Sequence, residues 1–137
     1  MYRYLVLVIL LLLFENTMAS CPAYDRRDYP HWIDLDQDCQ NTRHEVLVEE
    51  STVPVKFKTN KKCRVLTGKW WDSFSGKKFK DPGKLDIDHL VPLKEAHQSG
   101  AYAWDQAKRK AFANELKDSE HLIACLLYTS PSPRDRG

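Results

Sequence analysis

Two carboxylates and an imidazole crowd the end of one predicted strand, in the segment DIDHLVPL at residues 86–93. Asp86 and Asp88 project to the same side of a strand, whereas His89 joins them only if the chain bends there, and Pro92 ends the strand nearby. Close carboxylates repel each other unless a cation or a proton lies between them. A hard cation such as Mg²⁺ takes oxygen ligands, and a neutral imidazole beside it can accept a proton from attacking water. The pattern predicts metal-assisted phosphodiester hydrolysis; it competes with a surface turn of solvated acids, because short motifs also occur by chance.

The elements that position this segment are predicted to form a mixed α+β fold built largely from hairpins. Asn41 and Thr42 are residue types that cap helices and Glu45 follows, so we expect a short helix from about 42 to 50. Apolar patterns and turn residues predict strands over 53–57, 63–71, 85–91 and 121–124, with turns at 59–62, 75–76 and 81–83. Apolar residues at helical spacing predict a further helix from about 103 to 116.

The two ends of the 137-residue chain differ from the stretch between them. Residues 5–14 are ten consecutive apolar residues, too few to span a bilayer as a helix, which needs about 20. With Arg3 before them and Ala19 after them, they predict a secretory signal peptide over residues 1–19. The domain is then secreted, to the periplasm or the cell exterior. A lipid anchor at Cys21 is not expected, because Met18 fits a lipobox poorly.

Residues 125–137, CLLYTSPSPRDRG, have no periodicity. The string resembles a translated sequencing-adapter read-through, with a disordered natural tail as the alternative. On the first interpretation the domain covers residues 20–124, and the natural protein continues past Ala124.

Charge is divided unevenly along the chain. The formal net charge is +2, and by itself it does not indicate a nucleic-acid partner. Residues 25–50 carry a net charge of −5, residues 56–84 carry +8, and residues 85–124 carry −2. The basic stretch includes Lys69, Lys77 and Lys78, which could hold phosphates, although such runs are also found as plain solvated faces. The aromatic residues between these lysines, Trp70, Trp71, Phe74 and Phe79, are expected to form hairpin core rather than base-stacking platforms.

Cysteine usage agrees with export. An oxidising compartment permits a disulfide, and Cys39 with Cys63 is the expected pair, contributing about 3 kcal/mol by closing a loop. The sequence contains no C-x-x-C pair, so a cysteine zinc site is not expected.

An acidic loop precedes the first predicted helix. Asp34, Asp36, Asp38 and Glu45 have the spacing of positions 1, 3, 5 and 12 of a calcium-binding EF-hand loop. Cys39 stands at position 6, where that loop requires glycine for a sharp turn. The loop is therefore either a Ca²⁺ site with one broken position or a hydrogen-bonded loop held by a disulfide.

The segment at 86–93, with EAH at 95–97 and SGA at 99–101, resembles the first motif of the HNH endonucleases, the ββα-metal or His-Me finger nucleases. The similarity extends to the secreted bacterial branch related to the C-terminal domain of GmrSD-type restriction enzymes. It covers roughly residues 24–124, through YDR at 24–26, HW at 31–32, DLDQDCQNTR at 34–43, CRV at 63–65, GKW at 68–70, Arg109 and FAN at 112–114.

This resemblance implies a ββα-metal core with an N-terminal hairpin extension, and a secreted endonuclease that cleaves DNA, or RNA, without a small-molecule cofactor. His89 would be the general base, Asp88 a ligand of a divalent metal (Mg²⁺ above all), and Asp86 a supporting acid. His121 falls where the middle Asn of the HNH pattern stabilises the loop around the base. Arg43 and Arg109 become candidates for phosphate contact beside the three lysines.

The family completes its metal site with an Asn or His on a final helix, in an N-R-x-K-G-like segment that this sequence lacks. We therefore expect the chain to stop before the third motif and its helix, which puts the activity of this chain in doubt. A non-catalytic exported module that binds Ca²⁺ or nucleic acid, with no membrane span, is the alternative function.

Overall fold

The computed structural model describes residues 21–126 as a mixed α and β structure, in which the strands pair into two-stranded antiparallel sheets. In chain order the elements are η1 (Arg26–Asp28), α2 (Thr42–Glu49), β1 (Lys56–Phe57), β2 (Val65–Thr67), β3 (Trp70–Asp72), β4 (Lys77–Phe79), η2 (Pro82–Lys84), β5 (Leu85–His89), α3 (Leu93–Gln98), η3 (Ala101–Ala103), α4 (Gln106–Ala113) and β6 (Leu122–Leu126). The pairs are β1 with β2, β3 with β4, and β5 with β6. This confirms the mixed α+β class. The predicted signal peptide at 1–19 and residues 127–137 of the unusual tail lie outside the described residues.

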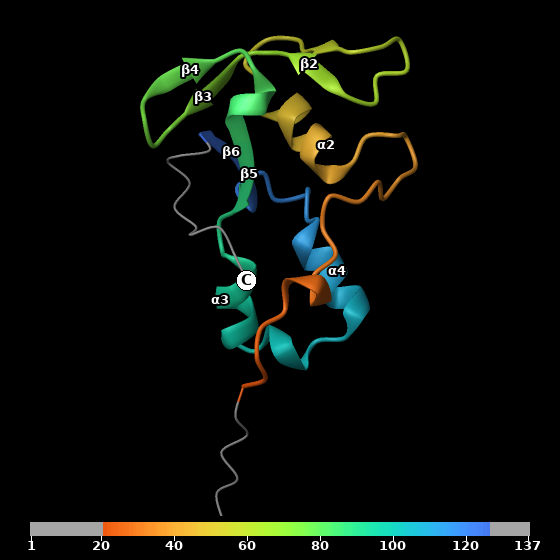
Figure 1. Cartoon of the computed structure of the whole chain (residues 1–137), viewed down its shortest axis with the longest axis vertical. Coiled ribbons are helices and arrows are strands. Elements are labelled where there is room, and N and C mark those ends of the chain that lie inside the picture. Colours follow the sequence, from red (N-terminus) through yellow and green to blue (C-terminus); the bar gives the residue numbers. More distant parts are fainter. Residues whose placement is uncertain (1–20, 127–137) are drawn as a thin grey trace, which may run out of the picture.

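The hairpins β1–β2 and β3–β4 occupy one end of the molecule, and α3 and α4 the other, with the β5–β6 pair between them (Figure 1). A first core cluster joins α2 to the strands through Val46, Leu47, Val65, Trp70, Leu85, Ile87, Leu122 and Ala124. A second cluster, around Tyr29, Leu93, Ala96, Ala101 and Ala113, joins the N-terminal segment to α3 and α4. The strand β5 therefore runs from the first core to the second.

The predicted helix at about 42–50 is confirmed as α2, and its start has a local cause. The Asn41 side chain accepts a hydrogen bond from the backbone N–H of His44, which satisfies one of the free donors of the first turn. Leu47 is fully buried, and its carbonyl accepts a hydrogen bond of 2.9 Å from the indole Nε1–H of Trp70. The helix and the hairpin β3–β4 are thus joined by a buried hydrogen bond as well as by apolar packing.

The single strand predicted over 63–71 is wrong, because the segment forms two strands in two different sheets. At Gly68 a Cβ atom would lie 2.7 Å from the Trp70 ring and 2.8 Å from Ser51 Oγ, so this position accepts only glycine. The chain changes partner there, from β1 to β4. The strand β4 was not predicted, because the expected turns at 75–76 and 81–83 left only four residues, 77–80, between them.

Three further elements differ from the sequence prediction. The helix α3 was missed, since Pro92 was interpreted as the end of a strand, whereas it stands immediately before the first residue of this helix. The helix expected over 103–116 is shorter, because the Asp105 side chain caps it by accepting from the N–H of Lys108. The strand β6 runs to Leu126, two residues past the predicted domain boundary, and Cys125 is 1% exposed.

Candidate active site

The strand β5 directs its three sequence-predicted residues to two opposite faces. Leu85, Ile87 and His89 are buried, while Asp86 and Asp88 are half-buried on the other side. The pairing with β6 is regular from Leu85 opposite Leu126 to His89 opposite Leu122. The bend that would have brought His89 beside the aspartates is therefore absent within the strand. Each aspartate accepts a 3.0 Å hydrogen bond from the backbone N–H of the residue that follows it.

His89 is fixed by a hydrogen bond to the end of α4. Its Nε2 lies 3.0 Å from the carbonyl oxygen of Ala113. A carbonyl oxygen can only accept, so Nε2 carries the proton and Nδ1 keeps its lone pair when the ring is neutral. The ring lies nearly parallel to those of Trp32 and Phe112, at interplanar angles of 26° and 15°. The packing and the hydrogen bond together define one orientation and one tautomer.

Burial keeps this imidazole uncharged. His89 is 6% exposed, and its removal from water lowers the pKa of the imidazole to about 4. The hydrogen bond to Ala113 acts in the opposite direction. Nearby His121, His31 and Arg26 lower the His89 pKa further by their positive charge. At neutral pH the ring is a proton acceptor at Nδ1. Its pKa lies below the range near 7 that suits a general base best.

His121 lies beside His89 and uses the neighbouring carbonyl of the same helix. Its Nε2 donates to the carbonyl oxygen of Phe112 over 2.8 Å, and its ring meets that of His89 edge-on with 5.8 Å between centroids. The backbone N–H of Leu90, directly after β5, donates to the carbonyl oxygen of His121. The structure thus brings His89 and His121 together, in contact and bound to consecutive carbonyls at the end of α4.

The two arginines expected to contact phosphate have protein partners. The Nη2 group of Arg43 donates to the carbonyl oxygens of Pro82 and Leu85, and its Nη1 lies 3.8 Å from Asp86 Oδ1. Burial lowers the pKa of Arg43, and the charge of Asp86 opposes that shift. Arg43 therefore holds the start of β5, and Asp86 faces it rather than His89.

Arg109 is placed in the same way on α4. It donates from Nε and Nη2 to the carbonyl oxygens of Ala101 and Tyr102, and its Nη1 lies 3.7 Å from Asp28 Oδ2. These contacts join α4 to η3 and to the N-terminal segment. A phosphate contact at either arginine stays a prediction.

The three lysines of the prediction lie away from His89. Lys69 precedes β3, and Lys77 and Lys78 belong to β4, in the hairpin at the end of the molecule where β5 begins (Figure 1). His89 is the last residue of β5, and a five-residue strand rises about 13 Å from its first to its last residue. The lysines therefore do not belong to the surroundings of His89.

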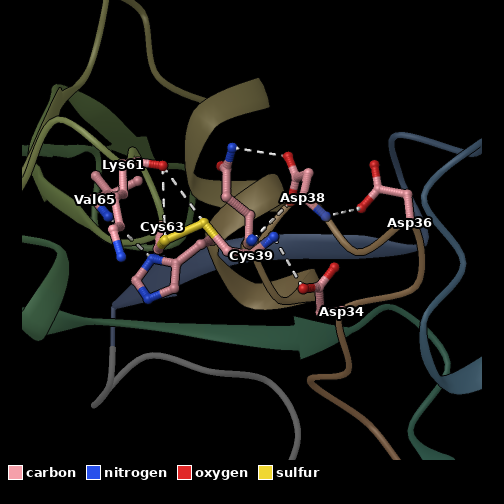
Figure 2. Close-up of a disulfide and its surroundings, with 9 residues drawn as sticks. Asp34, Asp36, Asp38, Cys39, Lys61, Cys63 and Val65 are labelled. Atoms are coloured by element: carbon pink, nitrogen blue, oxygen red, sulfur yellow. Dashed lines mark hydrogen bonds between the residues drawn. A yellow bond between two sulfur atoms is a disulfide. The ribbon is translucent and has the colours of Figure 1, made fainter.

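The acidic loop before α2 gathers three carboxylates. Oxygen atoms of Asp34, Asp36 and Asp38 all lie within 4.8 Å of one another, beside the disulfide (Figure 2). Asp34 accepts a hydrogen bond of 3.0 Å from the backbone N–H of Cys39, which closes the loop on itself. Cys39 has a φ of +77°, so it adopts the left-handed conformation for which position 6 of a calcium loop uses glycine. The predicted Cys39–Cys63 disulfide is confirmed.

Glu45 faces the same loop from the first turn of α2. Its pKa is raised, by burial first and then by the negative charges of Asp36, Asp38 and Asp34. Its Oε2 atom is buried and has no hydrogen-bond partner among the described residues. Four acidic side chains therefore repel one another at this end of α2, which is the condition that a divalent cation relieves.

The sequence analysis assigned no role to the residues that build the surroundings of His89, although Trp32 and Asn114 lie in segments that carry the family resemblance. Trp32, with a φ of +56°, packs its ring against His89 from 57 positions earlier in the chain, and no spacing announces that contact. Asn114 is 2% exposed and joins three segments: its Oδ1 accepts from Thr42 Oγ1, and its Nδ2 donates to the carbonyl oxygens of Pro30 and Lys110. An asparagine directly after a helix is the one local signal, since it suits a helix end.

The sequence matches no protein-family model, and no solved structure matches the chain. A protein of Arthroderma benhamiae (strain ATCC MYA-4681 / CBS 112371), described as an "Uncharacterized secreted protein", is 34% identical over 115 residues. The match covers 84% of this chain and 54% of that protein, so the chain spans about half the length of its curated relative. In the part of the chain that the structure describes, every helix is too short or too polar to cross a membrane.

Proposed function

We propose that this chain is a secreted HNH endonuclease of the ββα-metal class, which hydrolyses phosphodiester bonds in DNA with His89 as the general base. One observation carries the proposal: His89 lies at the end of β5 with Nε2 held by the Ala113 carbonyl and Nδ1 as its acceptor nitrogen, and burial lowers its pKa, so the ring is uncharged at neutral pH. Asp88 precedes it in the chain and projects to the opposite face of β5. The resemblance of residues 86–93 to the first HNH motif supports it. Secretion is supported by the description of the Arthroderma benhamiae relative and by the disulfide.

A divalent cation such as Mg²⁺ would supply Lewis-acid stabilisation of the phosphate charge. On β5 the chain offers it the carboxylate of Asp88, a hard oxygen donor that suits Mg²⁺, with Asp86 on the same side of the strand. Among the described residues, the group of three acidic side chains close enough to hold an ion lies in the acidic loop instead. His89 accepts a proton at Nδ1, and His121 and Ala113 hold its surroundings in place.

Plasmid nicking, with Mg²⁺ or with EDTA, tests the proposal. The informative variant is His89→Gln, because the glutamine amide keeps a donor for the Ala113 carbonyl while removing the base. We expect the wild type to nick only with the metal, and the variant to lose about 10²- to 10⁴-fold in rate. His44→Gln, at a half-buried histidine on α2, is the matched control and should nick normally. If His89→Gln nicks at the wild-type rate, His89 is not the general base. If the wild type cuts neither DNA nor RNA, the proposed nuclease function is wrong.

The second candidate is a Ca²⁺-binding exported module, and the acidic loop favours it. Asp34, Asp36 and Asp38 offer oxygens within 4.8 Å of one another, and Cys39 already holds the left-handed conformation of a calcium loop. Isothermal titration of EDTA-treated protein with CaCl₂ should show binding that Asp36→Asn weakens at least tenfold. The control is Asp81→Asn, at an exposed acid that caps η2. Calcium binding without nuclease activity would favour this candidate alone. No heat together with no stabilisation of the fold against urea by CaCl₂ would exclude it.

A further inference from the structure

One face of the β3–β4 hairpin is turned away from the core, and its residues follow from the strand register. Trp70 pairs with Phe79, and Trp71 pairs with Lys78. Directly paired residues lie on the same side of an antiparallel pair, and the sides alternate along each strand. Trp70 and Asp72 are buried, so Trp71 and Lys78 point outward. Lys69 and Lys80 directly flank the two strands, with Lys80 exposed and Lys69 half-buried. We call these four residues the outer hairpin face.

This arrangement corrects the expectation that the hairpin aromatics are all core. Trp70 is 1% exposed and Phe79 packs against the core, as expected. Trp71 is 51% exposed, and Phe74 in the adjoining turn is 49% exposed. An exposed aromatic ring on its own needs no explanation. Here, however, the indole has a cationic neighbour, because Lys78 Nζ lies 5.8 Å from the centroid of the Trp71 ring.

The outer hairpin face carries more positive than negative charge. Residues 68–81 contain four lysines and two acidic residues, Asp72 and Asp81, and the Asp81 side chain accepts a hydrogen bond from the backbone N–H of Gly83. The carboxylate of Asp72 is buried on the opposite side, where it accepts hydrogen bonds from the backbone N–H groups of Ser75 and Leu126. The outer hairpin face therefore presents an accessible indole among lysines, which is complementary to a partner that combines negative charge with flat aromatic rings.

The hairpin is held rigidly enough to act as a preformed platform. The Asp72–Leu126 hydrogen bond of 3.1 Å fixes β3 to the last residue of β6. The Trp70–Leu47 hydrogen bond fixes the same strand to α2, and the backbone N–H of Thr52 donates to the carbonyl oxygen of Lys69. Binding here requires no folding of the hairpin, so little ordering entropy is lost when a ligand stacks on it.

We propose that the outer hairpin face binds unpaired nucleotides, with a base stacked on Trp71 and the neighbouring phosphates held by Lys69, Lys78 and Lys80. The inference rests on the proposed nuclease function and narrows its substrate to single-stranded or locally unpaired nucleic acid. Stacking on an aromatic side chain requires the face of a base, which a continuous duplex hides between its neighbours, whereas phosphate contacts alone serve either form. Phe74, in the adjoining turn, offers a second ring for the next base.

The test measures binding without cleavage, by fluorescence anisotropy of a labelled oligothymidylate in EDTA. Stacking is worth about 1–3 kcal/mol per base, so Trp71→Ala should weaken binding about 5- to 150-fold. Trp71→Phe should restore most of that loss, because it keeps an aromatic face. Leu66→Ala is the matched control, since Leu66 is 52% exposed on the neighbouring strand β2 and should not matter. Lys78→Ala should reduce the salt slope of log K by about 0.7.

Three results would overturn the proposal: unchanged affinity in Trp71→Ala, duplex DNA bound as tightly as the single strand, or stronger binding to vesicles that contain phosphatidylglycerol than to the oligonucleotide. Circular dichroism confirms that each variant is folded. The parent hypothesis fails separately. If the protein binds the oligothymidylate through Trp71 but never nicks DNA with Mg²⁺, the binding site is supported and the nuclease hypothesis is wrong. If it nicks normally but binds the oligothymidylate independently of Trp71, only the proposed binding site is wrong.

Discussion

The disulfide between Cys39 and Cys63 should contribute more to stability than any other single bond of this domain. It joins the acidic loop to the residue two positions before β2, at a sequence separation of 24 residues. In the chain-entropy treatment, a loop of that length stabilises the folded state by about 3.5 kcal/mol at 25 °C, because it restricts the unfolded chain. Cys39 is exposed and Cys63 is only half-buried, so little packing is lost with the sulfur atoms. The variant Cys39→Ser/Cys63→Ser should therefore lose about 3.5 kcal/mol of unfolding free energy.

The backbone at Cys39 makes the prediction sharper. Its φ of +77° is in the left-handed region, which costs a residue other than glycine about 1–2 kcal/mol. Glycine removes that strain, but it adds about 0.4–1 kcal/mol of conformational entropy to the unfolded chain. The variant Cys39→Gly/Cys63→Ser should therefore be more stable than the serine pair by about 0.5–1 kcal/mol.

Urea unfolding followed by tryptophan fluorescence measures both differences, with the oxidised wild type as the reference. Cys21→Ser is the control, because Cys21 is exposed and takes no part in the disulfide; this variant should match the wild type. A serine pair within 1 kcal/mol of the wild type would refute the loop-closure reasoning. A glycine pair less stable than the serine pair would refute the strain assigned to Cys39.

Three further predictions use the same unfolding assay. Glu50→Ala leaves the backbone N–H of Ala124 without its carboxylate acceptor and should cost about 1–3 kcal/mol, whereas Glu50→Gln keeps an acceptor and should stay within about 1 kcal/mol; equal losses would contradict this. Asn114→Ala breaks buried hydrogen bonds to three segments and should cost about 3 kcal/mol or more, and a loss below 1 kcal/mol would show that water replaces the amide. In EDTA, the lowered pKa of His89, about 4, makes stability depend on pH. The neutral ring contributes fully to the unfolding free energy above the unfolded-state pKa of about 6.5, and this contribution is lost as the pH falls through 4. Between pH 7 and pH 4 the wild type should lose about 3 kcal/mol more than His89→Gln, and parallel curves would show that His89 titrates normally.

The parts of the fold that the sequence predicted correctly have local causes. Asn41 marks the start of α2, because a capping side chain needs only the N–H groups of the next turn. The Cys39–Cys63 pair was predictable because export permits a disulfide and the sequence has only four cysteines. Of the other two, Cys21 lies directly after the predicted signal peptide and Cys125 in the unusual tail. The pairing of β5 with β6 was not foreseen, although both strands were, since register depends on contacts between segments 33 or more residues apart.

The parts that were missed depend on distant partners. Gly68 ends a strand because the ring of Trp70 and the hydroxyl of Ser51 occupy the space of a side chain, and Ser51 lies 17 positions earlier in the chain. The outward position of Trp71 follows from its pairing with Lys78, on a strand that the sequence did not reveal. The environment of His89 is likewise made by Trp32 and by the end of α4, so neither its burial nor its pKa could be read from the residues 86–93.

The contact of His89 with α4 admits a structural interpretation as well as a catalytic one. The last carbonyls of a helix lack partners within it, and imidazole N–H groups commonly satisfy them. A histidine that serves only this purpose would gain from a positive charge, since the carboxyl end of a helix attracts cations. His89 instead has a lowered pKa, because burial outweighs the hydrogen bond to Ala113. His89→Gln separates the two roles: it keeps the donor to Ala113, so a stable variant that has lost its nicking activity assigns His89 to the chemistry, and a stable variant that still nicks assigns it to the helix.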